Sequence, residues 1–240
     1  MILYKYKDLT EPAHVLSILR GRLFCASPNI VNDPNEFKFT VDYRINQQTF
    51  VVLDSIRKNS GHGFNISVLG DNFPMKSALE LDMVIRPLFE DLVLQIRRDL
   101  GIASFAKDSN SSQLWERYAG DGDGVCVEIS LRNEDNVRRV DYEDDRRIHM
   151  NSILASLVDA GARKNLYEKI LLTKTTCWQT ENEMRYISKV GNVELSFDMN
   201  ITKLTIGQKV SEQDEQLLRA TIQNTFPSAV VVKQQKQRNG

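Results

Sequence analysis

The sequence predicts an α+β fold in which helices pack on a central mixed or antiparallel sheet. Short strand-like runs and helical runs are interleaved irregularly, without the strand-helix-strand regularity of a parallel α/β fold and without an internal repeat. The 240 residues include 41% hydrophobic and 26% charged residues, a balance typical of a globular protein with a buried core. We therefore expect a single domain over residues 1–240.

The first 37 residues carry the signals of a strand, a helix, a second strand and a turn. Apolar and polar residues alternate over residues 3–7, and Thr10-Glu11-Pro12 supplies a cap and an N1 proline for a helix that stops at Gly21. Residues 22–27 predict the second strand. The turn follows at Asn32-Asp33-Pro34, because Asn and Asp hydrogen-bond their own backbone and proline keeps the preceding residue out of the helical region.

Residues 45–100 are predicted to form a mostly helical insertion. Polar, glycine-containing stretches between residues 59 and 72 predict loops. An amphipathic pattern then runs from Ser77 to Gly101, and Pro87 is expected to kink or divide this helix.

Strand and helix signals alternate again after Gly101. Strands are predicted over residues 102–105, 125–129, 137–142, 178–188, 201–206 and 229–232, and helices over residues 109–118, 148–172 and 211–225. The polar residues 233–240 are expected to form a flexible tail. The loop Gly120-Asp121-Gly122-Asp123-Gly124 lacks the further acidic ligands of a calcium loop, so a plain turn is expected there.

Charge and cysteine content indicate the compartment and the classes of partner. A net charge of -1 predicts no general electrostatic attraction to nucleic acid or to an anionic membrane. No basic leader precedes an apolar run and no segment approaches the ~20 apolar residues needed to span a bilayer, so a cytoplasmic location without membrane contact is expected. Cys25, Cys126 and Cys177 are odd in number and far apart, which predicts three reduced, mostly buried thiols. No cysteine or histidine spacing indicates a metal site.

The segment from Cys177 to Ile187 carries the most informative pattern. Strand geometry would place Glu181, Glu183 and Arg185 on one face and Met184 and Tyr186 on the other. Two neighbouring carboxylates repel each other unless a positive charge faces them, so a folded protein keeps them in water or in a site. The segment is therefore either the solvated face of an edge strand with a cross-strand ion pair or part of a functional site.

Several short fragments occur in an order that is informative as a set. They are Leu3-Tyr4-Lys5-Tyr6, Leu23 to Pro28, Asn32-Asp33-Pro34 with Glu36, Leu114-Trp115 with Tyr118-Ala119, Gly124 to Val127, Trp178 with Glu181, Glu183 and Arg185, and Ile206-Gly207. Together they resemble the bacterial DUF2971 family over nearly the whole chain. The chain departs from that family at Arg117, where a histidine is usual, and at Phe105-Ala106, where a serine is usual. The family name states no activity.

A second resemblance implies a chemistry. An aromatic N-terminal strand, a helix, a strand, and a late strand with Glu-x-Glu are similar to the plan of ADP-ribosyltransferase folds, which implies a split central sheet. It also implies NAD as a cleaved substrate, an acceptor that is protein or nucleic acid, an antitoxin or activator as partner, and a role as a bacterial toxin or phage-defence effector. Because NAD would be a substrate, a Gly-x-Gly-x-x-Gly fingerprint is not required.

The same resemblance implies roles for individual residues. Glu183 would stabilise the ribosyl oxocarbenium, Glu181 would orient or deprotonate the acceptor, and Arg185 would balance their charge or bind the pyrophosphate. The aromatic walls of the NAD site would come from Tyr4, Tyr6, Trp115, Tyr118 and Trp178. Asn32 and Asp33 would hydrogen-bond the ribose.

Other interpretations of these residues remain open. The aromatic residues would also serve as ordinary core packing, and Asn32-Asp33 as a simple turn. A non-catalytic nucleotide- or protein-binding regulatory module would leave Glu181 and Glu183 in open water. A carboxylate-dependent hydrolase would use Asp33, Glu36 and Glu183, with raised carboxylate pKa values or a divalent metal as its sign.

Overall fold

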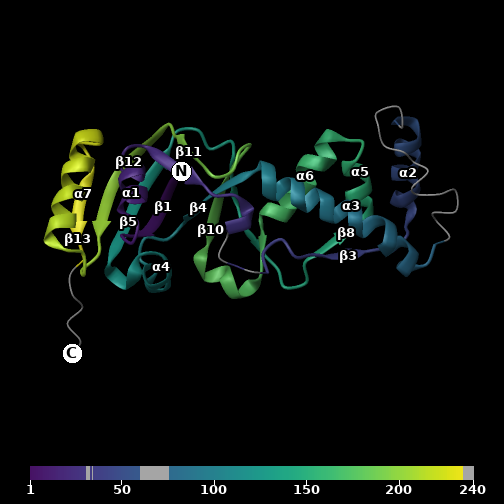
Figure 1. Ribbon diagram of the computed structural model, residues 1–240, viewed down its shortest axis with the longest axis horizontal. Coiled ribbons are helices and arrows are strands. Elements are labelled where there is room, and N and C mark those ends of the chain that lie inside the picture. Colours follow the sequence, from purple (N-terminus) through teal and green to yellow (C-terminus); the bar gives the residue numbers. More distant parts are fainter. Residues whose placement is uncertain (31–32, 34, 60–75, 235–240) are drawn as a thin grey trace. The chain divides into compact units, whose positions relative to one another are not determined.

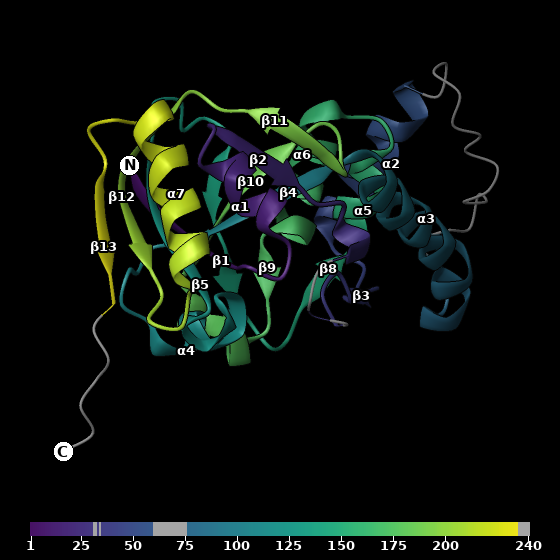
Figure 2. The same ribbon diagram turned by 60° about the vertical axis from the view of Figure 1, so that its left-hand side comes forward.

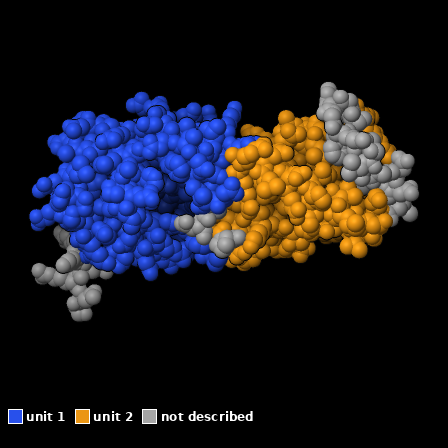
Figure 3. All heavy atoms as spheres, viewed as in Figure 1, with its two compact units in different colours: residues 1–30, 99–140, 177–240 blue, residues 31–98, 141–176 orange. Residues whose placement is uncertain are grey.

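The computed structural model describes residues 1–30, 33, 35–59 and 76–234 (Figure 1). The chain divides into two compact units, shown in Figure 3. Unit 1 comprises Met1–Ile30, Asp99–Val140 and Cys177–Gly240, and unit 2 comprises Val31–Arg98 and Asp141–Thr176. Strands and helices are mixed in both, which confirms the predicted α+β class.

Unit 1 is built on a sheet of seven strands. Their order is β13(Val230–Lys233), β12(Met199–Ile206), β5(Gly124–Leu131), β1(Ile2–Asp8), β4(Gly101–Ala106), β10(Glu183–Ser188) and β6(Val137–Arg139). The β12/β13 pair is parallel and the other neighbouring pairs are antiparallel, so the sheet is mixed, as predicted. A separate antiparallel pair joins β2(Arg22–Cys25) to β11(Val193–Ser196).

The two faces of this sheet are covered by different helices. On one face, α1(Pro12–Ile18) and α7(Glu212–Thr225) pack over the main hydrophobic core (Figure 2). The strand residues of that core include Leu3, Phe105 and Met184. On the other face, Tyr6 and other strand residues form a smaller cluster with α4(Ser112–Tyr118). Strand alternation explains the division, since successive side chains point to opposite faces.

Unit 2 is mainly helical. Its helices are α2(Gln47–Asn59), α3(Ala78–Asp99), α5(Met150–Ser156) and α6(Ala160–Leu171), and its short parallel strand pairs are β3(Thr40–Asp42) with β8(Arg147–His149) and β7(Asp141–Tyr142) with β9(Thr173–Lys174). Helices α2 and α3 occupy the described part of the region predicted as a helical insertion. Pro87 does not divide α3, because its ring lies on the exposed side, where water can solvate the carbonyl that loses its helical donor.

Several predicted elements are broken where the tertiary structure intervenes. The helix predicted over residues 148–172 is a strand and two helices, because the side chains of His149 and Asp159 each accept a backbone N–H and so begin a new helix. The strand predicted over residues 137–142 is divided between β6 and β7, which pair with different partners. The loops expected at residues 60–72 lie outside the described residues.

Lys233, the first residue of the predicted tail, belongs to a strand instead. Lys233 is the last residue of β13, and its Nζ donates to Glu215 Oε2 at 2.6 Å and to the Val210 carbonyl at 3.1 Å. Residues 235–240 lie outside the part of the chain that the structure describes.

Candidate functional site

The register of the central strands brings Tyr4 and Glu183 onto one face of the sheet. Tyr4 on β1 lies opposite Ala106 on β4, and Ala106 lies opposite Glu183 on β10. Directly opposed residues point to the same face, as do residues two apart on one strand. Tyr6 and Arg185 therefore share this face, on which α4 packs. The predicted alternation of Glu183, Met184 and Arg185 is confirmed, since Met184 lies in the core on the opposite face.

Glu181 is not on the strand, contrary to the prediction. It ends a 3-10 helix, Thr176–Glu181, and Asn182 follows with a left-handed φ of 42° before β10 begins. Strand alternation therefore cannot place Glu181 beside Glu183. The carboxylate is buried nevertheless, and its Oε1 accepts a 2.6 Å hydrogen bond from Tyr118 Oη on α4.

Arg117 is a member of this cluster that the sequence marked only as a departure from the family. Its Nη1 lies 3.7 Å from Glu181 Oε1, and its guanidinium lies over the ring of Trp178, 5.0 Å from the centroid. A cation at this position balances the buried carboxylate and is itself held by the aromatic face. Tyr118, Trp178 and Glu181 are thus brought together, and the roles that the resemblance implied for them stay predictions.

Glu183 and Arg185 form a buried two-bond ion pair along β10. Arg185 Nε donates to Glu183 Oε1 at 2.7 Å and Nη2 donates to Oε2 at 3.2 Å, and the two side chains are only 2% and 5% exposed. Strand β10 lies between β4 and β6, so its interpretation as a solvated edge strand is wrong. Such a pair holds the carboxylate in one orientation, and removing one partner leaves a buried charge at a cost of about 3–5 kcal/mol.

The aromatic residues fall into two groups. Tyr6 and Trp115 are buried and meet edge to face, with ring centroids 5.6 Å apart, and Tyr6 Oη donates to the Asp108 carbonyl at 2.9 Å. This arrangement is the one expected of core packing. Tyr4 and Trp178 are partly exposed, and burial together with the Glu128 carboxylate raises the pKa of Tyr4.

The Asn32-Asp33 turn belongs to unit 2, whereas Glu183 belongs to unit 1. Asn32 lies outside the described residues. Asp33 is buried, and its Oδ1 accepts the Asn35 backbone N–H at 2.8 Å, which is the expected turn chemistry. Asp33 Oδ2 is buried without a hydrogen-bond partner among the described atoms. The predicted ribose contact stays a prediction.

Lys5 is a further polar residue of this sheet, and its environment was not predicted from the sequence. It lies between Tyr4 and Tyr6 and therefore points to the opposite, apolar face, with Nζ 5.7 Å from the Phe105 ring centroid. Nζ donates to the Ser104 carbonyl at 2.7 Å. Burial lowers the pKa of Lys5 to about 8, against the opposing attraction of Glu183. The sequence signal for this position was that Lys5 follows the core residue Leu3 by two positions, because residues two apart on a strand point to the same face.

The cysteines are reduced, but one of them is not buried. Burial raises the pKa of Cys25 to about 11 and that of Cys126 to about 12, so both thiols stay protonated at neutral pH. Cys177 is exposed, contrary to the prediction, because it lies on the 3-10 helix rather than within a strand.

Within the described ranges, no three His, Cys, Asp or Glu side chains are grouped so that they could hold a metal ion. Among the same residues, no helix is long and apolar enough to cross a membrane. No family model, curated protein or solved structure matches this chain, so the two resemblances rest on the quoted residues alone.

Proposed function

We propose that unit 1 is an NAD-consuming mono-ADP-ribosyltransferase-like module, acting as a bacterial toxin or phage-defence effector, with its reactive centre at Glu183. The observation that carries this proposal is the buried, bidentate Glu183–Arg185 pair on the same sheet face as Tyr4. A carboxylate held in one orientation away from water stabilises developing positive charge without having to reorganise.

The proposed reaction uses this carboxylate at one step. The bond between the nicotinamide nitrogen and ribose C1′ breaks, and its electron pair leaves with nicotinamide. Glu183 stabilises the oxocarbenium character that develops at the ribose. A nucleophilic atom of the acceptor then bonds to C1′ and releases its proton to a base, for which Glu181 is our candidate. The products are nicotinamide, the ADP-ribosylated acceptor and a proton.

The contacts of the cations refine their proposed roles. Arg185 is engaged by Glu183, so we assign it to charge balance rather than to the pyrophosphate. Arg138 on β6 lies opposite Arg185 in the sheet and is partly exposed, so it is our candidate for the pyrophosphate contact. Tyr4 would supply the aromatic wall.

The alternatives fit the contacts less well. A non-catalytic binding module would leave Glu181 and Glu183 in open water, whereas both are about 5% exposed or less. Asp33 and Glu36, which a hydrolase would use with Glu183, belong to unit 2, and that interpretation stays a prediction. We therefore retain the transferase as the conclusion.

The test uses the full chain with NAD labelled in its adenylate phosphate and a mixture of cell protein, RNA and DNA. Label transfer and free nicotinamide are measured together. We expect turnover by the wild type and none by Glu183→Gln, while Glu212→Gln, an equal charge change at an exposed position of unit 1, should leave turnover unchanged.

A second variant separates catalysis from folding. Glu183→Gln alone leaves Arg185 buried without its carboxylate, and we expect the chain to lose stability for that reason. Combining it with Arg185→Gln removes both charges. Turnover by the folded double variant at the wild-type rate would exclude the proposed mechanism, and no turnover by folded wild type with any acceptor would favour the binding module.

A further inference from the structure

Unit 2 contains a pocket of about 530 Å³ that the proposed function does not use. Helices α2, α5 and α6 and strand β8 line it, and its wall includes the apolar side chains of Val52 and Leu166. Its volume falls within the range of small-molecule sites, about 300–1,000 Å³. Arg147 and Lys169 contribute positive charge, and no Asp or Glu is among the described residues that line it.

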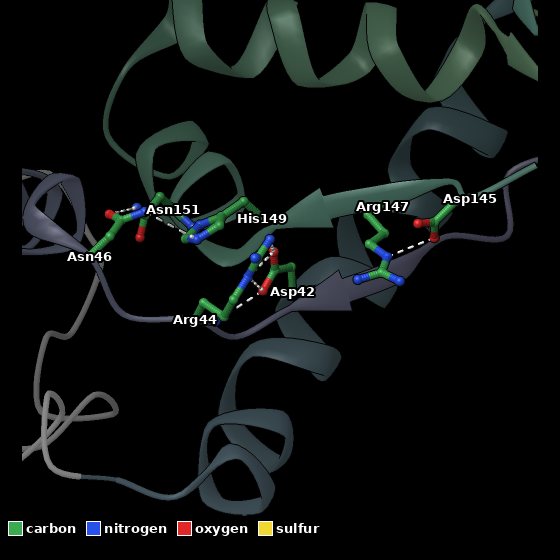
Figure 4. Close-up of polar contacts among 7 residues, drawn as sticks. All are labelled: Asp42, Arg44, Asn46, Asp145, Arg147, His149 and Asn151. Carbon is green, nitrogen blue, oxygen red and sulfur yellow. Dashed lines mark hydrogen bonds and ion pairs between the residues drawn. The ribbon is translucent and has the colours of Figure 1, made fainter. Parts of the chain in front are cut away.

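One wall of the pocket carries a buried acceptor without a partner. Asn151 is 7% exposed, and its Nδ2 donates to Asn46 Oδ1 at 3.1 Å (Figure 4). The amide orientation of Asn46 is determined independently, because the same Oδ1 accepts the Thr49 backbone N–H at the start of α2. Asn151 must therefore turn its nitrogen toward Asn46, which leaves Asn151 Oδ1 buried without a hydrogen-bond partner among the described atoms. Such a group costs about 1–3 kcal/mol.

Two donors belong to the residues that contact Asn151, His149 and Asn46. His149 Nδ1 accepts the Asn151 backbone N–H at 3.1 Å, so the neutral ring carries its proton on Nε2. That Nε2 lies 3.5 Å from Asn46 Nδ2, which also carries hydrogens. Two donors cannot bond each other, and an oxygen placed between them would accept from both.

The charges at the rim are only partly balanced. Arg147 Nε lies 2.6 Å from Asp145 Oδ1, and Lys169 Nζ lies 3.3 Å from Glu143 Oε1. These ion pairs are solvent-exposed, and exposed pairs are worth about 0–1 kcal/mol. An anion in the pocket can therefore compete for both cations at little cost.

We propose that this pocket binds a small organic phosphate that carries hydroxyl groups, of the sugar-phosphate class. A ligand hydroxyl donates to Asn151 Oδ1, a ligand oxygen accepts from His149 Nε2, and the phosphate contacts Arg147 and Lys169, all of which line the pocket. A neutral sugar lacks the charge for the cations, and inorganic phosphate alone cannot reach both the rim and the buried amide. This inference stands independently of the transferase proposal.

The experiment is calorimetric titration of the full chain with ribose 5-phosphate, ribose and inorganic phosphate. We expect saturable binding of ribose 5-phosphate, at least about ten times tighter than either fragment and weakened by added salt. Absence of saturable binding would mean a water-filled pocket and would overturn the proposal. Equal affinity for inorganic phosphate would mean a simple anion site and would overturn it as well.

Variants identify the atoms that bind. His149→Asn retains a good helix cap for α5 but removes Nε2–H, and we expect about a tenfold loss of affinity with the fold unchanged. Asn151→Leu removes the unpartnered acceptor and should abolish binding. It also removes the hydrogen bond to Asn46 Oδ1, but that oxygen keeps its bond from the Thr49 backbone N–H. Lys169→Gln should weaken binding, whereas Lys164→Gln, the same charge change on α6 outside the pocket lining, should not. Undiminished affinity in both His149→Asn and Asn151→Leu would refute the assignment.

Discussion

Lys5 offers a quantitative test of how unit 1 is packed. Its pKa is lowered by burial from 10.5 to about 8, so the folded protein disfavours the charged amine. Between about pH 8 and 10.5 the unfolded chain binds more protons at this residue than the folded chain does, and the contribution of Lys5 to stability therefore rises with pH through this window. Below pH 8 Lys5 is protonated in both the folded and the unfolded state, and the buried charge then destabilises the folded state in full. The cost is about 3 kcal/mol, because the pKa of Lys5 differs by about 2.5 units between the two states.

Lys5→Met removes the charge and keeps an unbranched side chain of similar length next to Phe105. At pH 7 we expect the variant to be more stable than the wild type by about 2 kcal/mol, since the lost hydrogen bond to Ser104 offsets about 1 kcal/mol of the relieved penalty. The difference should narrow by about 1 kcal/mol from pH 7 to pH 9.

The assay is urea unfolding at pH 7, 8 and 9, followed by circular dichroism and tryptophan fluorescence. The range stops at pH 9 because the raised pKa values of Cys25 and Cys126 make stability fall as pH rises above that point. Lys189→Met is the matched control, because it makes the same charge change at an exposed position of unit 1 and should leave the pH dependence unchanged. Parallel wild-type and Lys5→Met stability curves from pH 7 to 9 would refute the reasoning.

Three further predictions concern the same unit. Arg185→Met alone should lower the free energy of unfolding by about 3–5 kcal/mol, and adding Glu183→Gln should recover much of it; a purely additive urea-unfolding result would contradict a coupled buried pair. Tyr118→Phe should cost about 1.5–3 kcal/mol in the same assay, because it removes the hydrogen bond to the buried Glu181 carboxylate; an unchanged midpoint would argue against that bond. Cys177 should react with a thiol reagent in the folded chain, while the two buried cysteines should react only after unfolding; equal labelling of all three would be inconsistent with their burial.

Local patterns predicted many of the elements of unit 1. The alternation around Leu3, the proline after Glu11 and the apolar run from Val125 correspond to β1, α1 and β5 with small shifts at their ends. These signals are local, because side-chain direction alternates along any strand and caps act within one turn. Unit 2 was predicted less well. The caps at His149 and Asp159 were present in the sequence but hidden inside a long helical pattern.

In the candidate site as well, local patterns predicted positions along a strand but not contacts between distant residues. Spacing correctly placed Glu183 and Arg185 on one strand face, but the left-handed Asn182 removed Glu181 from the strand. The contact between Glu181 and Tyr118 joins residues 63 positions apart, and no local pattern encodes such a contact. Arg117 and Lys5 were missed because their importance depends on what packs against them.

The sequence by itself determined the α+β class, most strands and helices of the sheet unit, and the two-residue spacing that allows Glu183 and Arg185 to pair. Only the tertiary structure decided that β10 lies inside the sheet, that its ion pair is buried, that Tyr4 shares its face, and that Lys5 lies against Phe105 on the opposite face. The physical reason is that strand periodicity is a property of neighbouring residues. Strand order, burial and the charge state of a buried group depend on residues distant in the chain.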